Sequence, residues 1–275
     1  MTRVAYLGPA GTFTEEAARR FGVEGAQYVP VESPAAALAA LDAGEAEYAV
    51  CAIENSIDGA VTTTMDALAA TESARIVGET ELAIAFAVMT RQGQKLDDAL
   101  RLATHPVAHQ QVKRWIAENA PKAEFIPAPS NAAAAKMVAD GAADVAVAPE
   151  RAAALHGLEV HARGVADAET ARTRFVLVAK QPAPPQPTGN DRTAIVFRTK
   201  NEPGALVRVL QEFAARGVDM TRIESRPTRE ARNTYDFFVD LAGHANDAAV
   251  ADALEAGAAH TTEIRQLGTW PREAR

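Results

Sequence analysis

QPAPPQPTGN, residues 181–190, is the stretch that divides this chain. Four of its ten residues are proline, which lacks a backbone N–H donor and favours extended polyproline geometry. We therefore interpret residues 181–190 as a linker between an N-terminal domain, 1–180, and a C-terminal domain, 191–275. The length of 275 residues agrees with two domains, because a domain commonly contains about 100 to 200 residues.

The domain before the linker alternates short apolar runs with alanine-rich stretches, a pattern typical of an α/β fold. In chain order we expect strand 4–7, helix 15–21, strand 27–31, helix 34–41, strand 48–53 and helix 63–70. A second series follows, with strand 101–104, a helix over about 108–118, strand 123–126, a helix after Ser130 and strand 144–148.

Two such series predict two lobes, one formed by about 1–80 with 165–180 and the other by about 81–164. The apolar segment 82–89 would lead into the second lobe, and 174–179 would return to the first. A double crossing of this kind places a ligand cleft between the lobes, as in periplasmic-binding-protein-like folds.

The domain after the linker shows a different order of elements. We expect strand 193–198, helix 204–216, strand 219–226, strand 234–241, helix 247–256 and strand 264–267. This βαββαβ order predicts a ferredoxin-like α+β domain.

The composition excludes several classes of protein. With 48% apolar and 23% charged residues, the chain is neither disordered nor collagen-like. A net charge of −8 argues against nucleic acid as the main partner. Cys51 is the single cysteine, which excludes an intramolecular disulfide and fits a reducing cytoplasm. With no apolar run of about 18 residues and no signal-peptide core, we expect a cytoplasmic protein without a membrane partner.

Three polar segments follow expected strands, where α/β proteins place binding residues. They are GPAGTFT at 8–14, ENSIDGAV at 54–61 and THPVAHQQ at 104–111. Taken singly, each is equally a turn or a helix start. His105 and His109 have the spacing of metal ligands, but Pro106 lies between them and a convincing third ligand is missing. We therefore expect no metal site.

A fourth segment, TARTRFVLV at 170–178, places Thr173 between Arg172 and Arg174 at the start of the returning strand. Guanidinium and hydroxyl donors in this position suit the capture of an anion. Solvent-facing arginines on an alternating strand would give the same pattern.

Taken together, these motifs resemble the bacterial prephenate dehydratase family. The matching stretches are 8–14, 54–68, 104–111, 130–135 and 173–175 before the linker, and NEPGALV at 201–207 and IESRP at 223–227 after it. The last two resemble the signatures of that family's regulatory ACT domain. The resemblance covers nearly the whole chain, and the joint presence of the motifs is far more specific than any one of them.

The resemblance implies conversion of prephenate to phenylpyruvate, water and carbon dioxide in phenylalanine biosynthesis, without a metal or organic cofactor. The catalytic residues it implies are Glu54, Asn55, Thr173, Arg174 and Phe175. Thr173 would donate a proton or hydrogen bond to the departing hydroxyl. The substrate-binding residues it implies are Thr12, Ser56, Thr104, Gln111, Ser130 and Asn131, with helix starts receiving the two carboxylates.

Several positions depart from the family pattern. Val107 stands where glutamine is usual, Asn131 where threonine is usual and Arg172 where asparagine is usual. Thr104, which often is serine, keeps its hydroxyl, but Val107 has no side-chain hydrogen-bonding group. The departures affect expected substrate contacts and leave the central assignment in place.

For the C-terminal domain, the resemblance implies that L-phenylalanine binds as an effector between two subunits of a homodimer or homotetramer. The residues implied are Asn201, Pro203, Gly204, Ala205, Leu206, Val207, Glu224, Ser225, Arg226 and Pro227. Gly204 permits close approach before a helix. The alternative interpretation is an ordinary Pro-Gly helix entry with surface charges on a strand.

Two other functions are compatible with the sequence. An arogenate dehydratase performs the same elimination on a substrate bearing an amino group. A non-catalytic amino-acid sensor would combine a binding-protein-like domain with an ACT domain, although the Thr173–Phe175 triplet argues against it.

Overall fold

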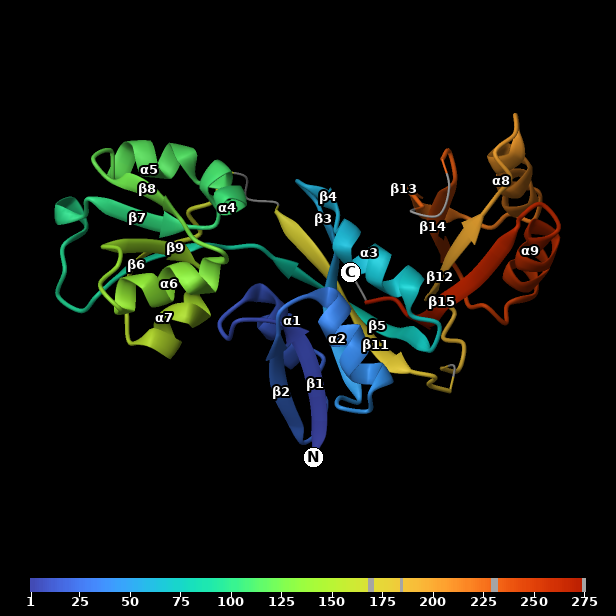
Figure 1. Ribbon diagram of the computed structural model, residues 1–275, viewed down its shortest axis with the longest axis horizontal. Helices are drawn as coiled ribbons and strands as arrows, with labels where there is room; N and C mark the ends of the chain where they lie inside the picture. Colours follow the sequence, from blue (N-terminus) through green and yellow to red (C-terminus); the bar gives the residue numbers. More distant parts are fainter. Residues whose placement is uncertain (168–170, 184, 229–231, 274–275) are drawn as a thin grey trace.

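The computed structural model describes residues 1–167, 171–183, 185–228 and 232–273. The chain forms two lobes and a C-terminal domain. In Figure 1 the second lobe and the C-terminal domain lie at opposite ends of the molecule, and the first lobe lies between them. The α/β class, the bilobal arrangement and the ferredoxin-like C-terminal domain are confirmed. Pro184 of the expected linker lies outside the described residues.

The first lobe is built around the returning strand β11. Its elements are β1 (Thr2–Leu7), α1 (Phe13–Arg20), β2 (Ala26–Val31), α2 (Pro34–Asp42), β3 (Tyr48–Asn55), β4 (Gly59–Ala60), α3 (Thr62–Ala70), β5 (Ala74–Ala83) and β11 (Arg172–Lys180). The strand order is β5-β11-β3-β1-β2, and β11 is antiparallel to both of its neighbours. Because β11 comes back from the second lobe, it connects the two lobes directly.

The second lobe has its own sheet, in the order β10-β6-β9-β7-β8. Its elements are β6 (Ala87–Thr90), a 3₁₀ turn (Leu96–Asp98), β7 (Arg101–Thr104), α4 (Pro106–Gln111), α5 (Lys113–Asn119), β8 (Glu124–Pro127), α6 (Asn131–Ala139), β9 (Val145–Ala148), α7 (Glu150–His156) and β10 (Glu159–Arg163).

The single helix expected over about 108–118 is wrong, because the helix breaks at Val112. The Gln111 carbonyl accepts the Asp167 N–H at 2.6 Å instead of continuing a helical ladder. This long-range bond could not be read from local propensity.

The C-terminal domain has the expected βαββαβ order, with β12 (Asp191–Arg198), α8 (Ala205–Ala215), β13 (Met220–Pro227), β14 (Tyr235–Ala242), α9 (Ala248–Ala258) and β15 (Glu263–Pro271). Its sheet order is β13-β14-β12-β15. Helices α8 and α9 cover one face, where Phe197, Phe213 and Leu241 share an apolar cluster.

The other face of the C-terminal sheet packs on the first lobe. One apolar cluster contains Met65 and Leu68 of α3 together with Val196, Phe238 and Trp270 of the C-terminal domain. Trp270 is fully buried. Burial of such large side chains is the dominant favourable contribution at a junction of this kind.

The two sheets also meet edge to edge, where β15 lies beside β5 at Gly268 and Ile76. Gly268 has φ +152, and a Cβ atom built on it would lie 2.1 Å from the Ile76 carbonyl oxygen. Only glycine permits this approach, because the obstructing atom is backbone.

We expect Gly268→Ala to separate the C-terminal domain from the first lobe and to lower the free energy of unfolding by about 1 to 3 kcal/mol, the usual range for overpacking. The matched control is Gly257→Ala inside α9, where the nearest side-chain atoms lie 3.7 Å from the new Cβ and alanine favours the helix. Denaturant unfolding followed by circular dichroism measures both. Equal stability of the two variants would contradict the steric explanation.

Candidate active site

The ends of β3 and β11 bring Asn55 and Thr173 together. The strands pair these residues directly, and Asn55 Nδ2 donates to Thr173 Oγ1 at 2.8 Å. Asn55 Oδ1 accepts the backbone N–H groups of Ile57 at 2.8 Å and Asp58 at 3.0 Å. These two bonds fix the orientation of the amide, so its NH₂ group must face Thr173.

This arrangement determines what the Thr173 hydroxyl can do. The side chain is buried, and its oxygen already accepts from Asn55. Across the described part of the chain, no acceptor is found for the Thr173 proton. The hydroxyl is therefore positioned by Asn55 and keeps its one proton to donate, although its oxygen retains a second acceptor lone pair.

The turn after β3 is fixed to β11 and reaches the second lobe. Ser56 exchanges two bonds with the Arg172 backbone, each 2.9 Å: its N–H donates to the carbonyl, and its Oγ accepts the N–H. Asp58 Oδ2 accepts from Gln111 Nε2 of α4 at 3.4 Å. Gln111 Oε1 is buried without a partner among the described residues. A buried amide oxygen without a donor is a ready acceptor for a ligand group.

Thr104, Ser130 and Asn131 form a second polar group in the second lobe. Thr104 is fully buried and donates to the Val147 carbonyl at 2.8 Å. Asn131 Oδ1 accepts the His105 N–H at 3.1 Å and lies 3.3 Å from Thr104 Oγ1. Ser130 caps α6 by accepting the Ala133 N–H. Thr104 and Ser130 thus have structural partners, whereas the Asn131 NH₂ group makes no hydrogen bond to another described residue.

Thr12 also has a structural partner, since its hydroxyl caps α1 by accepting the Glu15 N–H at 3.3 Å. The Gly11 N–H, expected to be available to a substrate carboxylate, donates to Glu15 at 2.6 Å. Glu15 also pairs with Arg19 and with Arg151 of α7. Burial opposes ionisation of Glu15, but these donors hold its pKa below the usual range. The internal carboxylate thus occupies this helix start and ties the two lobes together.

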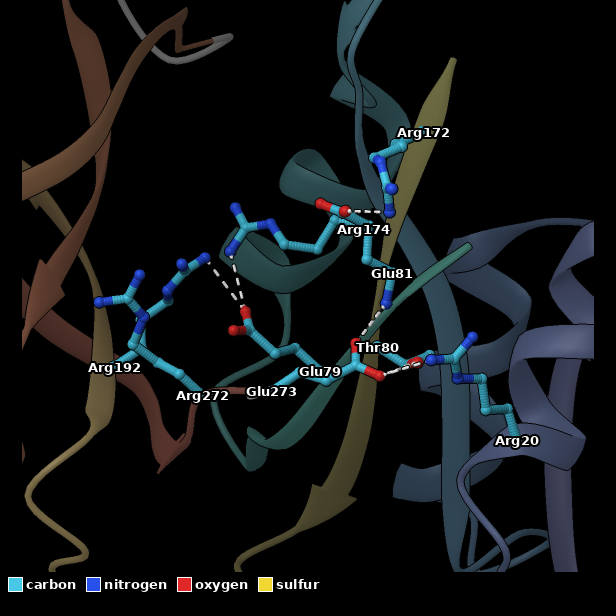
Figure 2. Close-up of a pocket in the computed structure, with 9 residues that line it drawn as sticks. All are labelled: Arg20, Glu79, Thr80, Glu81, Arg172, Arg174, Arg192, Arg272 and Glu273. Atoms are coloured by element: carbon cyan, nitrogen blue, oxygen red, sulfur yellow. Dashed lines mark hydrogen bonds and ion pairs between the residues drawn. The ribbon is translucent and has the colours of Figure 1, made fainter. Parts of the chain in front are cut away.

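The triplet Thr173-Arg174-Phe175 is divided between the two faces of β11, as strand geometry requires. Phe175 is buried in the first-lobe core with Tyr6. Arg174 points away from Thr173, toward the C-terminal domain, and pairs with Glu54 at 3.0 Å, Glu79 at 3.2 Å and Asp240 at 2.7 Å. Figure 2 shows this guanidinium in a pocket on that side. Arg174 and Glu54 therefore do not share the surroundings of the Thr173 hydroxyl, whereas Phe175 lies on the same face of β11 as Thr173.

Asp240 is the centre of a buried charge cluster. Its carboxylate pairs with Arg222 of β13 at 3.0 Å as well as with Arg174. Burial raises the pKa of Asp240, but Arg222 and Arg174 outweigh this and hold its pKa at about 2. The cluster links β11 to β13 and β14 across the domain junction.

The histidines of the THPVAHQQ motif have structural partners. His105 caps α4 by accepting the Val107 N–H at its Nδ1. His109 stacks on Phe125 with ring centroids 4.0 Å apart, and burial lowers its pKa. In the portion of the chain that the structure describes, no group of three His, Cys, Asp or Glu side chains could hold a metal ion. Nor is any described helix long and apolar enough to cross a membrane.

The expected effector residues lie at the start of α8 and along β13. Gly204 has φ +77 and begins α8, next to a cavity of about 340 Å³ that Ala205 helps to line. Val207 and Ile223 are exposed apolar side chains. Arg226 instead pairs with Asp66 of α3 at 2.9 Å, so this residue belongs to the domain junction.

The remaining expected effector residues also lie either near the start of α8 or on β13. Asn201 and Pro203 lie in the loop before α8, Leu206 packs in the α8–α9 core, Ser225 and Pro227 are exposed, and Glu224 is half-buried on β13.

Sequence reasoning missed Asp58 and Asp240. Asp58 is the first charged residue after the strand end that carries Asn55, a signal that was available. Asp240 lies inside an apolar strand. A charged residue within that apolar run is the one sequence signal that could have identified it.

The chain is similar to known proteins over nearly its whole length. The family model for prephenate dehydratase matches residues 4–183, and the ACT domain model matches residues 193–256. A prephenate dehydratase of Corynebacterium glutamicum is 52% identical over 276 residues, covering 98% of this chain and 88% of the relative.

Two solved structures are also similar over nearly the whole chain. The prephenate dehydratase of Arthrobacter aurescens in complex with L-Phe has a TM-score of 0.92 at 39% identity, covering 98% of this chain and 90% of that one. GqqA, described as a novel type of quorum quenching acylase, has a TM-score of 0.90 at 34% identity, covering 98% of each chain.

We expect Asp240→Asn to leave Arg174 and Arg222 underpaired and to lower the free energy of unfolding by about 3 to 5 kcal/mol. The folded pKa of Asp240, about 2, lies below the ordinary 3.8. Its stabilisation is therefore present above about pH 4 and lost as the pH falls toward 2. Unfolding between pH 2 and 7 should show a flatter acid decline in the variant. Exposed Asp252→Asn is the control, and a variant with unchanged stability would contradict this role.

Proposed function

The chain belongs to the prephenate dehydratase family, and from this premise we propose that it converts prephenate to phenylpyruvate. The observation that carries the proposal is the Thr173 hydroxyl, which Asn55 holds in place at 2.8 Å and whose proton has no acceptor among the described residues. We propose residues 1–180 as the catalytic domain, 181–190 as the linker and 191–275 as the regulatory domain.

The reaction removes a carboxylate and a hydroxyl from opposite ends of the substrate ring. The bond from the ring to its carboxylate breaks and releases carbon dioxide, and its electron pair enters the ring. The carbon–oxygen bond breaks at the same time, and the hydroxide leaves as water after gaining one proton. The ring becomes aromatic, which drives both cleavages, so the enzyme has to position the substrate and stabilise the departing oxygen.

Thr173 suits the second task. Its hydroxyl donates a hydrogen bond to the departing oxygen as negative charge develops there, in a buried setting where such a bond is strong. Asn55 is the positioning residue, since its fixed amide orients the Thr173 oxygen. The leaving hydroxide takes its proton from this donor or from water.

The second lobe supplies the opposing polar groups. We assign the Gln111 amide oxygen and the Asn131 amide to the substrate, with Thr104 acting through Asn131. Ser56 holds the turn after β3 against β11 through its two hydrogen bonds to the Arg172 backbone. Val107 is exposed and cannot replace the family's usual glutamine as a hydrogen-bonding group.

The same site is poorly suited to an acylase reaction, the activity named for GqqA. A threonine nucleophile needs a neighbouring base to take its proton. The partner of Thr173 is the Asn55 amide, which already donates and cannot accept that proton.

For the C-terminal domain we propose that L-phenylalanine is the effector, as the complex of the Arthrobacter aurescens relative suggests. The start of α8 offers N–H groups for a carboxylate, and the adjoining cavity of about 340 Å³ offers room. Exposed Val207 and Ile223 offer apolar surface for a second subunit, and we propose a homodimer or homotetramer.

We expect Thr173→Ala to lower kcat for prephenate about 100- to 1000-fold, the usual cost of one such donor. Thr173→Ser should recover most of the rate because it restores the hydroxyl. Phenylpyruvate formation is followed by absorbance, with arogenate as a parallel substrate and circular dichroism as the check on folding. An alanine variant with unchanged kcat would remove Thr173 from catalysis, and preference for arogenate would redefine the substrate.

We expect L-phenylalanine to lower the turnover of the full chain and to raise its melting temperature. Gly204→Ala should weaken the response, because a Cβ at the start of α8 obstructs close approach. Gly217→Ala is the matched control, since Gly217 also has positive φ but meets nothing within 4 Å. If both variants lose the response equally, backbone strain explains the loss and the effector site is misplaced.

A further inference from the structure

A pocket of about 570 Å³ lies on the face of β11 opposite to Thr173. Figure 2 shows its walls, which come from β5, β11, the start of β12, the segment after β15 and Arg20 of α1. Five arginines line it: Arg20, Arg172, Arg174, Arg192 and Arg272. None of the functions assigned above uses this pocket.

Three glutamates face these arginines, and each of them is already paired. Glu81 pairs with Arg172 at 3.0 Å, and Glu273 pairs with Arg20 at 2.8 Å. Glu79 is shared by two arginines, as the dashed lines in Figure 2 show: Arg174 at 3.2 Å and Arg192 at 3.1 Å. Asp240, which does not line the pocket, also pairs with Arg174 and lies 3.6 Å from Arg192, and Glu54 pairs with Arg174. Among the residues that line the pocket, arginines still outnumber carboxylates.

The excess is concentrated on Arg192 and Arg272. Within residues 1–167, 171–183, 185–228 and 232–273, Arg272 has neither a hydrogen bond nor an ion pair through its half-buried side chain. Arg192 Nε is buried without a partner, as is Nε of Arg174. Buried guanidinium N–H groups without an acceptor are costly unless a ligand supplies one.

The electrostatics favour the same conclusion. Burial, then the neighbouring charges of Arg174 and Arg272, lower the pKa of Arg192. An oxyanion between Arg192 and Arg272 would separate these like charges and accept from both planar groups, the geometry for which arginine is best suited.

We propose that this pocket binds one small free oxyanion, carrying carboxylate or phosphate groups, between Arg192 and Arg272. Because Arg192 and Arg272 belong to the C-terminal domain while Glu79 and Arg174 belong to the first lobe, the anion would stabilise the junction between them. The proposal does not depend on the reaction proposed above.

The test is isothermal titration calorimetry of the full chain with inorganic phosphate and, separately, with citrate, at constant ionic strength set by chloride. We expect saturable binding of one anion per chain for at least one probe, and the tighter probe identifies phosphate or carboxylate as the preferred group. Binding that does not saturate, or the absence of binding by both probes, would overturn the proposal.

Variants locate the site. Arg272→Gln should weaken binding at least tenfold while leaving the fold intact, since Arg272 has no described protein partner to lose. Arg163→Gln removes the same charge from an exposed pair in the second lobe and should bind as the parent does. Thr173→Ala should also bind normally, because Thr173 faces the other side of β11, and this separates the pocket from the active site. Equal affinity of Arg272→Gln and the parent chain would place the anion elsewhere.

Discussion

The contact between Arg174 and Asp240 constrains the rest of the structure. Arg174 lies on β11 of the first lobe and Asp240 on β14 of the C-terminal domain, and both side chains are almost fully buried. Removing two charges from water is expensive, and their attraction compensates only when the geometry is close to ideal. The pair therefore favours one arrangement of the two domains, and Arg222 and Glu79 add further ion pairs on either side. The apolar contacts around Trp270 supply the stabilisation, and the buried charges make the docking specific.

The alternation of side chains along β11 places this ion pair directly beside Thr173 in sequence but on the opposite face of the strand. Consecutive residues of β11 point to opposite faces, so Thr173 and Arg174 belong to different sites although they are neighbours in sequence. The same holds for Asn55 and Glu54 on β3, which pair with Thr173 and Arg174 respectively. The C-terminal domain therefore contacts the same short stretch of backbone that carries Thr173.

Much of this could be predicted from the sequence, and the limits have physical causes. The two α/β series and the βαββαβ order are local patterns, and the structure confirms those elements apart from the single helix expected over about 108–118. The family resemblance placed Asn55 and Thr173 in one site, and the structure brings the two side chains into contact. Motif resemblance grouped Arg174 with Thr173, however, because a motif records neighbours along the chain and not the face of a strand. The Arg174–Asp240 pair joins residues 66 positions apart, and no local signal encodes such a partner.

The path from the C-terminal domain to the active site follows from what each part touches. The polar residues Gln111 and Asn131 belong to the second lobe, which lies at the opposite end of the molecule from the C-terminal domain (Figure 1). Among the described residues, the hydrogen bonds and ion pairs that leave the C-terminal domain reach the first lobe and the linker, and none reaches the second lobe. In the described part of the chain, the C-terminal domain is therefore coupled by polar contacts to the first lobe and not to the second. Strand β11 contacts the C-terminal domain through Arg174, carries Thr173 and connects to the second lobe at its start. It is therefore the element that links the C-terminal domain with both lobes.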